Sequence, residues 1–392
     1  MIGRLPPAGF PLRSGDRRAA LAGWRDPEGA RERLVRSLEE IFPGRRAFPV
    51  SSGRAALTLL LDACRRVRPG RDRVAVGAYT CWSVPAAVSR AGLKVQPVDL
   101  DPADLDFREE ALRGIDGDRI LAIVTHHLFG HPNRLVRLEA LAREWGAFLI
   151  DDAAQGFGAA PPGKTAGAAG EGGLLSFGRG KAIPALGGGA LLVEKGGTLD
   201  GALRVPAGGG RGALRTCEAW AQSLFFRPSL YGIPASLPWL GIGETIYDES
   251  FAVGPAEGAV AGLAERLLHG REEKTEARRR RSERYREEAA ARGLPIRFPE
   301  PAGPSSAIRC PVYVEAAERD AVWRAVRSLG VAASYPSPIR EIPGLDPERL
   351  VSGGGTEGAE TIAREILTLP THPLIDDGIA DSILEKMGRA LR

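Results

Sequence analysis

Residues 174–192 read LLSFGRGKAIPALGGGALL. The apolar run from Gly173 to Phe177 and the second run from Ala190 to Glu194 predict two buried strands. Three glycines, Gly187 to Gly189, return the chain from the first strand to the second. Lys181 is therefore expected on a tight loop between two strands of a sheet.

A lysine on such a loop has a specific chemical use. Most lysines are solvated surface groups, but the amine of a lysine that is desolvated beside buried strands loses its proton readily. A neutral amine is a nucleophile that forms a Schiff base with an aldehyde, as in enzymes that use pyridoxal phosphate (PLP). One lysine cannot establish this chemistry, so other site residues are needed to support it.

A second motif, LIDDAAQGFG, occupies residues 149–158. Together with the Ser-Phe-x-x-x-Lys pattern that ends at Lys181, it resembles the DegT/DnrJ/StrS family of PLP-dependent sugar aminotransferases, in which an acidic pair precedes Ala-Ala-Gln. The resemblance spans residues 45–195, weakens after them and returns near the C-terminus. It implies an α/β protein with fold type I of the PLP-dependent transferases.

The resemblance implies roles for residues of both motifs. Lys181 would hold PLP as a Schiff base, the internal aldimine, and would act as the catalytic base and acid. Asp152 would pair with the pyridine nitrogen and keep it protonated, which makes the ring a better electron sink; Asp151 is the competing candidate. Gln155 would lie over the ring or its hydroxyl, and Ser176 is a further candidate for cofactor binding.

The turn before the first apolar helix predicts a phosphate-binding site. Residues 48–57, FPVSSGRAAL, pass from an extended segment through Ser-Ser-Gly into the helix. Free backbone N–H groups and the positive end of the helix dipole favour an anion there. By resemblance, Gly53 lies in the turn that holds the PLP phosphate, and Arg54 replaces the usual threonine. Arg54 either contacts the phosphate directly or points away and leaves the phosphate to the backbone amides.

Two more predicted strand ends carry candidate site residues. In residues 77–83, GAYTCWS, Cys81 stands where the family has an aromatic residue that stacks on the cofactor ring. Trp82 either takes over this stacking or belongs to the core. Residues 126–132, HHLFGHP, resemble a family segment with His127 at the family's histidine, a candidate substrate contact. No carboxylate or thiolate accompanies the histidines at a recognisable spacing, so we predict no metal site.

Several positions depart from the family pattern. Ser250 and Ala252 replace its Asn-x-Arg motif, which reaches the cofactor of the partner subunit. Ser250 could still bond a phosphate oxygen, but alanine cannot replace a cation, so Arg54 or Arg179 is expected to compensate. Arg340 replaces a histidine; it either clamps the carboxylate of the amino donor or is an exposed structural arginine.

Strands and helices alternate between residues 73 and 151. Short apolar runs separated by helices predict a mostly parallel, doubly wound sheet, which binds ligands at the carboxyl ends of its strands. The resemblance implies seven strands in a large domain beside a smaller α/β domain. We expect the PLP-binding domain over residues 1–255, with an irregular arm and one helix in 1–45. The small domain, 256–392, would begin with a long charged helix over 256–292.

An apolar insert is expected over residues 204–248. Its segment 224–243 is nearly all apolar and has the length of a membrane span. Arg227 and three prolines argue against a straight spanning helix, so we predict no transmembrane span. The segment either packs at a subunit interface or over the active site, or makes peripheral contact with a membrane or a lipid-linked substrate.

Composition excludes other classes of protein. With 53 basic and 49 acidic residues the net charge is only +4, and acidic residues interleave with the arginine run at 278–281, as on a solvated helix face. We therefore expect no nucleic-acid partner. The four cysteines are widely spaced, which predicts reduced thiols in a cytoplasmic protein, and the N-terminus lacks the layout of a signal peptide.

The whole pattern predicts a PLP-dependent aminotransferase, with glutamate as the expected donor and a keto or aldehyde sugar, expected to be nucleotide-linked, as the acceptor. A homodimer is expected because the sites of the family form between subunits. Two alternatives stay open: other PLP chemistry on the same site, such as a lyase or decarboxylation step, and a non-catalytic regulatory or binding descendant.

Overall fold

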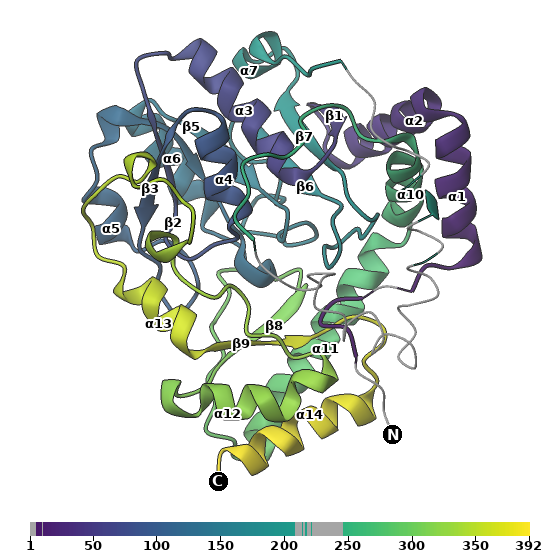
Figure 1. The fold of residues 1–392 in the computed structure, drawn as a ribbon, viewed down its shortest axis with the longest axis vertical. Coiled ribbons are helices and arrows are strands. Elements are labelled where there is room, and N and C mark those ends of the chain that lie inside the picture. Colours follow the sequence, from purple (N-terminus) through teal and green to yellow (C-terminus); the bar gives the residue numbers. More distant parts are fainter. Residues whose placement is uncertain (1–4, 10, 208–213, 215, 218–220, 222–245) are drawn as a thin grey trace.

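Seven strands form one central sheet in the part of the chain that the structure, a computed structural model, describes: residues 5–9, 11–207, 214, 216, 217, 221 and 246–392 (Figure 1). The strands are β1 (Arg45–Val50), β2 (Arg73–Gly77), β3 (Lys94–Val98), β4 (Ile120–Val124), β5 (Phe148–Asp152), β6 (Gly172–Ser176) and β7 (Gly189–Glu194). Their order is β1-β7-β6-β5-β4-β2-β3. β7 is antiparallel to both neighbours, and the pairs from β6 to β3 are parallel. The predicted mostly parallel, seven-stranded sheet is confirmed.

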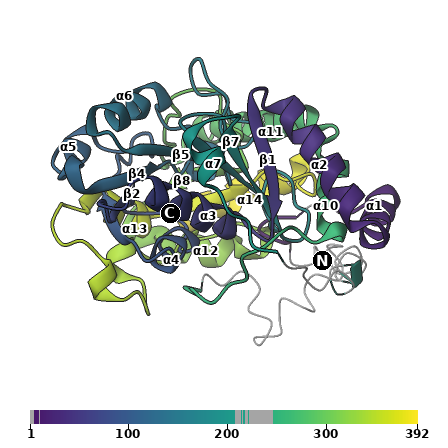
Figure 2. The same cartoon turned by 90° about the horizontal axis from the view of Figure 1, so that it is seen from above.

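Helices cover both faces of this sheet. Figure 2 shows α6 (Leu135–Trp145) on one side and α3 (Gly53–Val67) and α4 (Ser83–Arg90) on the other. Successive side chains of a strand point to opposite faces, so Val74 packs in the core with α3 and α4, whereas Ala75 packs in the core with α6. A strand buried on both faces is apolar at nearly every position, which explains the short apolar runs of the sequence.

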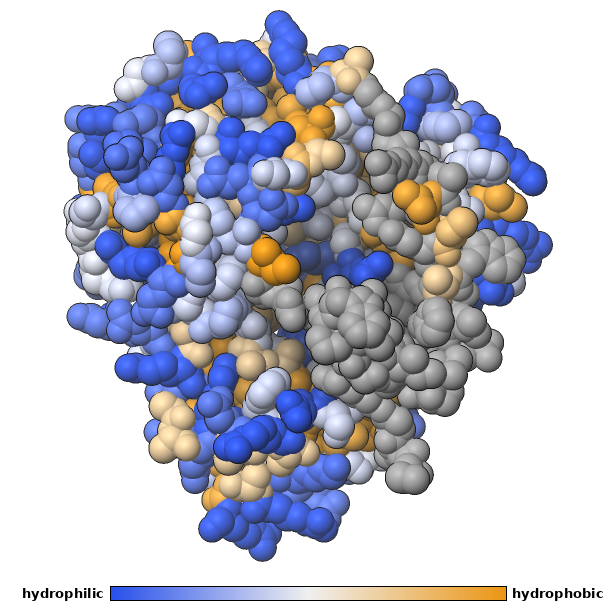
Figure 3. Space-filling view, in the orientation of Figure 1, coloured by the Kyte–Doolittle hydropathy of each residue, from blue (hydrophilic) through white to orange (hydrophobic). Residues whose placement is uncertain are grey.

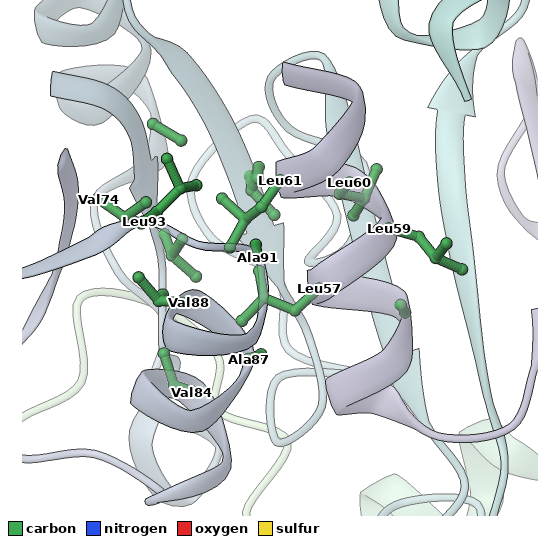
Figure 4. Close-up of a cluster of buried hydrophobic side chains, with 14 of the residues drawn as sticks. Leu57, Leu59, Leu60, Leu61, Val74, Val84, Ala87, Val88, Ala91 and Leu93 are labelled. Carbon is green, nitrogen blue, oxygen red and sulfur yellow. The ribbon is translucent and has the colours of Figure 1, made fainter. Parts of the chain in front are cut away.

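The packing of α3 fixes the position of its N-terminus. Leu57 and Leu61 of α3 lie against Val84 and Val88 of α4 and Val74 of the sheet, and all of them are buried (Figure 4). Burying one such side chain contributes about 1.5–3 kcal/mol. The helix begins after Ser52, whose Oγ accepts a hydrogen bond from the Ala55 N–H at 3.1 Å. The first turn of α3 is therefore held at the carboxyl ends of the strands.

A second, smaller unit contains a two-stranded antiparallel sheet. Its strands are β8 (Arg309–Tyr313) and β9 (Ile366–Pro370). Three helices pack on them, α11 (Arg271–Ala291), α12 (Ala316–Val326) and α14 (Asp377–Ala390), around a core that includes Tyr285, Val312 and Ile383. Beside β9, Ala332 forms an isolated antiparallel bridge with Thr368.

Two expectations about helices are wrong. The arm expected to be irregular contains α1 (Ser14–Arg25) before the predicted helix, α2 (Pro27–Ile41). The single helix expected over 256–292 is interrupted: α10 (Gly258–Leu268) ends before Gly270, which has φ +70° and precedes α11. α10 packs against α1 so closely that a Cβ on Gly23 would lie 2.2 Å from the Gly258 oxygen. The domain boundary at 255/256 stays a prediction.

The remaining helices are short or flank the units already described. Among the described residues, the remaining α-helices are α5 (Glu109–Arg113), α7 (Thr198–Ala202) and α13 (Glu357–Glu365). The predicted apolar segment 224–243 lies outside the described residues, so its packing is not tested. Among the described helices, none has the length and apolar character that crossing a membrane requires. The face in Figure 3 is mainly hydrophilic, with scattered apolar side chains.

Candidate active site

Most of the predicted site residues meet in one cavity of about 170 Å³ at the carboxyl ends of the strands. The first turn of α3, the loop after β2, the end of β5 and the loop after β6 supply its lining. Predicted residues in that lining are Gly53, Arg54, Cys81, Asp152, Gln155, Ser176 and Lys181. The two motifs that carry the family resemblance are therefore brought together in space, although about thirty residues separate them in the sequence.

One end of the cavity suits a phosphate group. The first amides of a helix have no intrahelical acceptor, and in α3 the Ser52 side chain satisfies only that of Ala55. A Cβ on Gly53 would lie 2.9 Å from the Cβ of Ser176, so this approach of helix and strand requires glycine. No acceptor for the amides of Gly53 and Arg54 is found in the described part of the chain, so both are left to receive an anion.

Arg54 stands between this cavity and a second one of about 420 Å³. Its Nη1 donates to Asp248 Oδ2 and to the Asp248 carbonyl, both at 3.3 Å, and its guanidinium lies 4.5 Å from the centre of the Phe251 ring. The side chain therefore remains at the edge of the cavity but already has a carboxylate partner. Contact of Arg54 with the phosphate stays a prediction.

The carboxylate of Asp151 takes all its hydrogen bonds from other groups of the protein. It is completely buried and accepts four hydrogen bonds: from Thr125 Oγ1 at 2.9 Å, from His127 Nε2 at 2.6 Å, and from the amides of Gly167 and Ala169 at 2.7 and 3.1 Å. Burial alone would raise the pKa of its carboxyl, but His127 and the amides outweigh burial and lower that pKa. Asp151 therefore holds neighbouring loops together behind the cavity.

Asp152 presents a carboxylate to the cavity. One of its oxygens accepts a hydrogen bond from the Ala154 amide at 2.9 Å, and the side chain is 7% exposed. Burial raises its pKa to about 6, and the charge of Lys181 only partly opposes this shift. A cation placed beside Asp152 would stabilise the ionised form. Of the two acids, only Asp152 lines the cavity, so the geometry favours it as the partner of a pyridine nitrogen.

Lys181 lies on the predicted tight loop. Its backbone N–H donates to the Gly178 carbonyl at 3.2 Å, and the preceding Gly180 has φ +75°, a left-handed conformation that favours glycine. Within the described chain its amine makes neither a hydrogen bond nor an ion pair, and the side chain is half-buried in the cavity wall. The amine is therefore available to a ligand.

His127 lies behind the cavity, outside its lining. The side chain is fully buried. Its Nδ1 accepts the Asn133 amide at 3.0 Å, so the ring proton is on Nε2, which donates to Asp151. A ring held in this neutral form orients Asp151, and it does not reach a ligand as the resemblance implied. Its neighbour His126 lines the cavity instead.

The aromatic neighbours of the cavity differ from the prediction. Cys81 lines it, but Trp82 is 6% exposed and belongs to the core cluster around α3 and α4. Sequence reasoning missed Tyr335, whose hydroxyl accepts a hydrogen bond from Gln155 Nε2 at 3.1 Å. Tyr79 holds its backbone, because the Tyr79 hydroxyl donates to the Tyr335 carbonyl at 3.1 Å. Burial raises the pKa of the Tyr335 hydroxyl well above its usual value, so this group stays protonated.

Three more predicted residues lie outside the cavity lining, in addition to His127 and Trp82. Ser250 is exposed, and its amide donates to Asp248 Oδ1 at 2.7 Å. Arg179 is exposed on the lysine loop. Arg340 donates to the carbonyl of Gly353, which fits its structural alternative better than a substrate clamp. The structure does not bring these side chains to the amine of Lys181.

Comparisons with known proteins place the chain in one family. The sequence model described as the DegT/DnrJ/EryC1/StrS aminotransferase family matches residues 20–224 and 258–388. The L-glutamine:2-deoxy-scyllo-inosose aminotransferase of Streptomyces kanamyceticus is 35% identical over 184 residues, which are 46% of this chain and 42% of that protein. The UDP-N-acetyl-3-dehydro-alpha-D-glucosamine 3-aminotransferase of Acidithiobacillus ferrooxidans is 28% identical over 329 residues, 82% of this chain and 78% of that protein.

Solved structures agree on the fold. The aminotransferase TlmJ from Streptoalloteichus hindustanus matches 99% of both chains with a TM-score of 0.76 at 21% identity, which confirms fold type I but, at this identity, nothing more. The chain spans between 38% and 42% of the length of several curated relatives that it matches. The family model, in contrast, covers most of the chain, so the chain belongs to the DegT/DnrJ/EryC1/StrS aminotransferase family, whose members depend on PLP.

Proposed function

We propose that the chain is a PLP-dependent aminotransferase that moves an amino group from an amino acid to a keto or aldehyde sugar. The observation that carries this proposal is the single cavity that contains Lys181, Asp152 and the first turn of α3. The names of two relatives, aminotransferases of 2-deoxy-scyllo-inosose and of a UDP-linked dehydro-glucosamine, support the same reaction class. Glutamate as donor and a nucleotide-linked acceptor are parts of this proposal.

The lining fits the parts of PLP. The amides of Gly53 and Arg54 would receive the phosphate, and the Ser176 side chain lies beside them. Asp152 would face the pyridine nitrogen, and Gln155, fixed by the Tyr335 hydroxyl, would lie near the ring. When bound, PLP withdraws electrons from the carbon that carries the amino nitrogen.

Lys181 supplies the proton transfer. A half-buried amine that has no partner among the described residues can take a proton from the α-carbon of the donor and later return one to the carbon that receives the amino group. The donor leaves as its 2-oxo acid, and the carbonyl of the acceptor becomes an amine. Asp152 and the α3 amides keep their positions throughout, because packing and hydrogen bonds fix their backbone.

The reaction class can be tested without knowing the acceptor. The purified chain is mixed with PLP and glutamate, or with glutamine for comparison, and the 2-oxo acid and the visible absorption of the bound cofactor are measured. Stoichiometric formation of the 2-oxo acid supports the proposal. Release of carbon dioxide or loss of a substituent would instead favour the lyase or decarboxylation alternative, and no change of the cofactor would favour the non-catalytic one.

Replacing Arg54 with alanine should weaken PLP binding. Arg54 borders the phosphate end of the cavity, and the family's arginine is absent at Ala252, so the guanidinium is proposed to compensate for that charge. Loss of charge-assisted hydrogen bonds to a phosphate predicts a roughly 10- to 100-fold higher dissociation constant. Equilibrium dialysis of PLP measures it. Arg66→Ala, an exposed arginine at the other end of α3, is the control, and an unchanged PLP affinity of Arg54→Ala would contradict the compensation.

A homodimer is also proposed. The cavity of about 420 Å³ shares Ser52, Arg54 and Ser176 with the cofactor cavity, and a partner chain would cover this side. Sedimentation equilibrium should give twice the mass of the chain. A fully active monomer would contradict the proposal, because it would show that one chain forms the complete active site. A cytoplasmic location is proposed from the free state of all four cysteines.

A further inference from the structure

The start of the described chain runs from the small unit to the lysine loop, which is the segment 177–188 between β6 and β7. Residues 5–9, 11 and 12 are called the strap here, and Figure 1 shows this start of the chain, in purple, beside α11. Leu5 is buried in the core of the small unit. Leu12 is buried in another core cluster, which also contains Ala182 of the lysine loop. The strap therefore has one end in each core.

Two prolines keep the strap extended and make its carbonyl groups the points of attachment. Pro6 and Pro7 have a fixed φ and no backbone N–H, so they cannot donate to a sheet or a helix. The Pro6 carbonyl accepts a hydrogen bond from His372 Nε2 at 3.0 Å. The Pro7 carbonyl accepts one from Nη1 of Arg309. Both donors belong to the small unit, so that unit holds the strap in place.

Arg309 is the stronger of these two attachments. Its Nε donates to Thr368 Oγ1 at 2.6 Å, and its Nη2 donates to the carbonyls of Thr368 and Gly330 at 2.9 and 3.2 Å. Burial lowers its pKa to about 10, so the side chain stays charged at neutral pH. Hydrogen bonds from a charged donor are roughly twice as strong as those between neutral groups. The guanidinium therefore ties the Pro7 carbonyl firmly to β8 and β9.

The middle of the strap touches the lysine loop one residue before Lys181. A Cβ on Gly180 would lie 2.8 Å from the Cβ of Ala8, so the loop approaches the strap this closely only because residue 180 is a glycine. A space of about 20 Å³, with room for about one water molecule, separates Ala8 and Gly9 from Lys181. No described residue of the strap lines the cofactor cavity. The strap therefore supports the loop from outside that cavity.

The lysine loop needs support from other segments. Gly178 and Gly180 precede Lys181, and glycine gives a backbone more conformational freedom than any other residue. A second support comes from α11: Arg278, expected on a solvated helix face, is only 6% exposed and donates from Nη2 to the Ala182 carbonyl at 3.3 Å. Contacts at Gly180 and Ala182 thus hold the loop on either side of the lysine.

We infer that the strap positions the lysine loop and that Arg309 is a positioning residue, which acts on Lys181 through the Pro7 carbonyl and Ala8. Proton transfer requires the amine within hydrogen-bond reach of the reacting carbon. A displacement of about 1 Å can slow such a step about 10²-fold. This inference deepens the proposed function, and only its rate measurement rests on that function.

Hydrogen–deuterium exchange of the full chain without PLP tests the support directly, in peptides that cover residues 177–188. Leu5→Ala and Arg309→Gln should each speed exchange of the loop amides roughly 10- to 100-fold, because each loosens one attachment of the strap. Leu384→Ala is the control for the first variant, since it removes the same side chain from the same core but on α14. Arg297→Gln, at an exposed arginine of the same unit, is the control for the second. Neither control should change exchange in the loop.

The rate of 2-oxo acid formation from glutamate gives a second readout. In both strap variants kcat should fall by up to about 10²-fold, and KM for glutamate should stay unchanged, because the described strap residues do not line the cavity. Arg309→Lys keeps the charge and one donor for the Pro7 carbonyl, so it should recover part of the rate and part of the protection of the loop. Together with Leu5→Ala, it tests the inference even if Arg309→Gln does not fold.

The exchange measurement separates this inference from the proposed function, because it requires neither cofactor nor turnover. Unchanged exchange in the loop of both strap variants overturns the inference. An equal increase in Leu384→Ala also overturns it, since the loop would then follow the stability of the whole core. A wild type that forms no 2-oxo acid, although its loop responds to the strap variants, contradicts the proposed function alone. A wild type that forms the 2-oxo acid, with a loop that does not respond, contradicts this inference alone.

Discussion

Replacing Lys181 with alanine should abolish transamination and leave the fold unchanged. The amine makes no hydrogen bond or ion pair within the described residues, so its loss removes no structural contact. Substitutions that break no hydrogen bond, ion pair or helix cap and leave no core cavity usually change stability by about 0.5 kcal/mol or less. The lost proton transfer alone is worth about 10²–10⁴-fold, and loss of the covalent hold on the cofactor adds to it. Formation of 2-oxoglutarate from glutamate measures the activity.

The control for this change is Lys195→Ala, because Lys195 is an exposed lysine just after β7 that pairs with Glu39 on the surface. After reduction with borohydride, the wild type and this control should carry PLP covalently, and Lys181→Ala should not. A small primary amine added to the medium should restore part of the activity of Lys181→Ala. Retention of activity without added amine would show that another group moves the proton.

The strands were predictable because each one is buried on both faces. The short apolar runs expected between residues 73 and 151 include those that form β2, Arg73–Gly77, and β4, Ile120–Val124. Strands in that position need apolar side chains nearly throughout, and glycines or polar residues end them. Local composition is then sufficient to predict the strands, and the carboxyl ends of these strands position the residues proposed to bind the cofactor.

The N-terminal helix α1 was not predictable from the same signal. Ser14–Arg25 reads SGDRRAALAGWR and contains few large apolar residues. It is held by small residues: Gly23 of α1 meets Gly258 of α10 at backbone contact distance. Close packing through glycine and alanine leaves no apolar periodicity in the sequence. The helix α1 therefore becomes recognisable only when its contact with α10 is known.

Other site features depend on contacts between distant segments. The four consecutive arginines at 278–281 read alike, yet only Arg278 faces the lysine loop and is buried. Tyr335 reaches Gln155 across 180 positions of the sequence. Likewise, His126 and His127 are neighbours, and the choice of which one lines the cavity depends on the hydrogen bond of His127 to Asp151.

Replacing Asp152 with asparagine should lower activity and raise the stability of the protein without PLP. Activity should fall roughly 10²–10⁴-fold, a range typical for the loss of a group that controls a catalytic proton. The stability change follows from the raised pKa of Asp152. The folded protein holds this proton up to about pH 6, whereas the ordinary pKa of an aspartate carboxyl is 3.8, so the carboxylate costs stability once it is ionised. Urea unfolding at several pH values measures this cost.

The sign of the stability change depends on pH. As the pH rises from about 4 to about 6, wild type without PLP should lose roughly 2–3 kcal/mol through Asp152 and should not regain it at higher pH. The asparagine variant has no proton to lose, so it should be the more stable protein above pH 6 and not below pH 4. Asp151→Asn gives the opposite result, since the folded pKa of Asp151 is lowered and its four donors need the carboxylate.

Binding of PLP should reverse the order of stability, so that wild type becomes more stable than Asp152→Asn. A protonated ring nitrogen would place a cation directly against the Asp152 carboxylate, so the ionised carboxylate stops costing stability and begins to contribute to it. Above pH 6, PLP should therefore stabilise wild type much more than the variant. If PLP stabilised both equally, Asp152 would not face the ring nitrogen, and the raised pKa would be only the cost of a buried carboxylate. The free energy that the unpaired Asp152 carboxylate loses on ionisation is recovered when a cation binds beside it. The Asp151 carboxylate already has four hydrogen-bond donors, so a cation would recover no such free energy there.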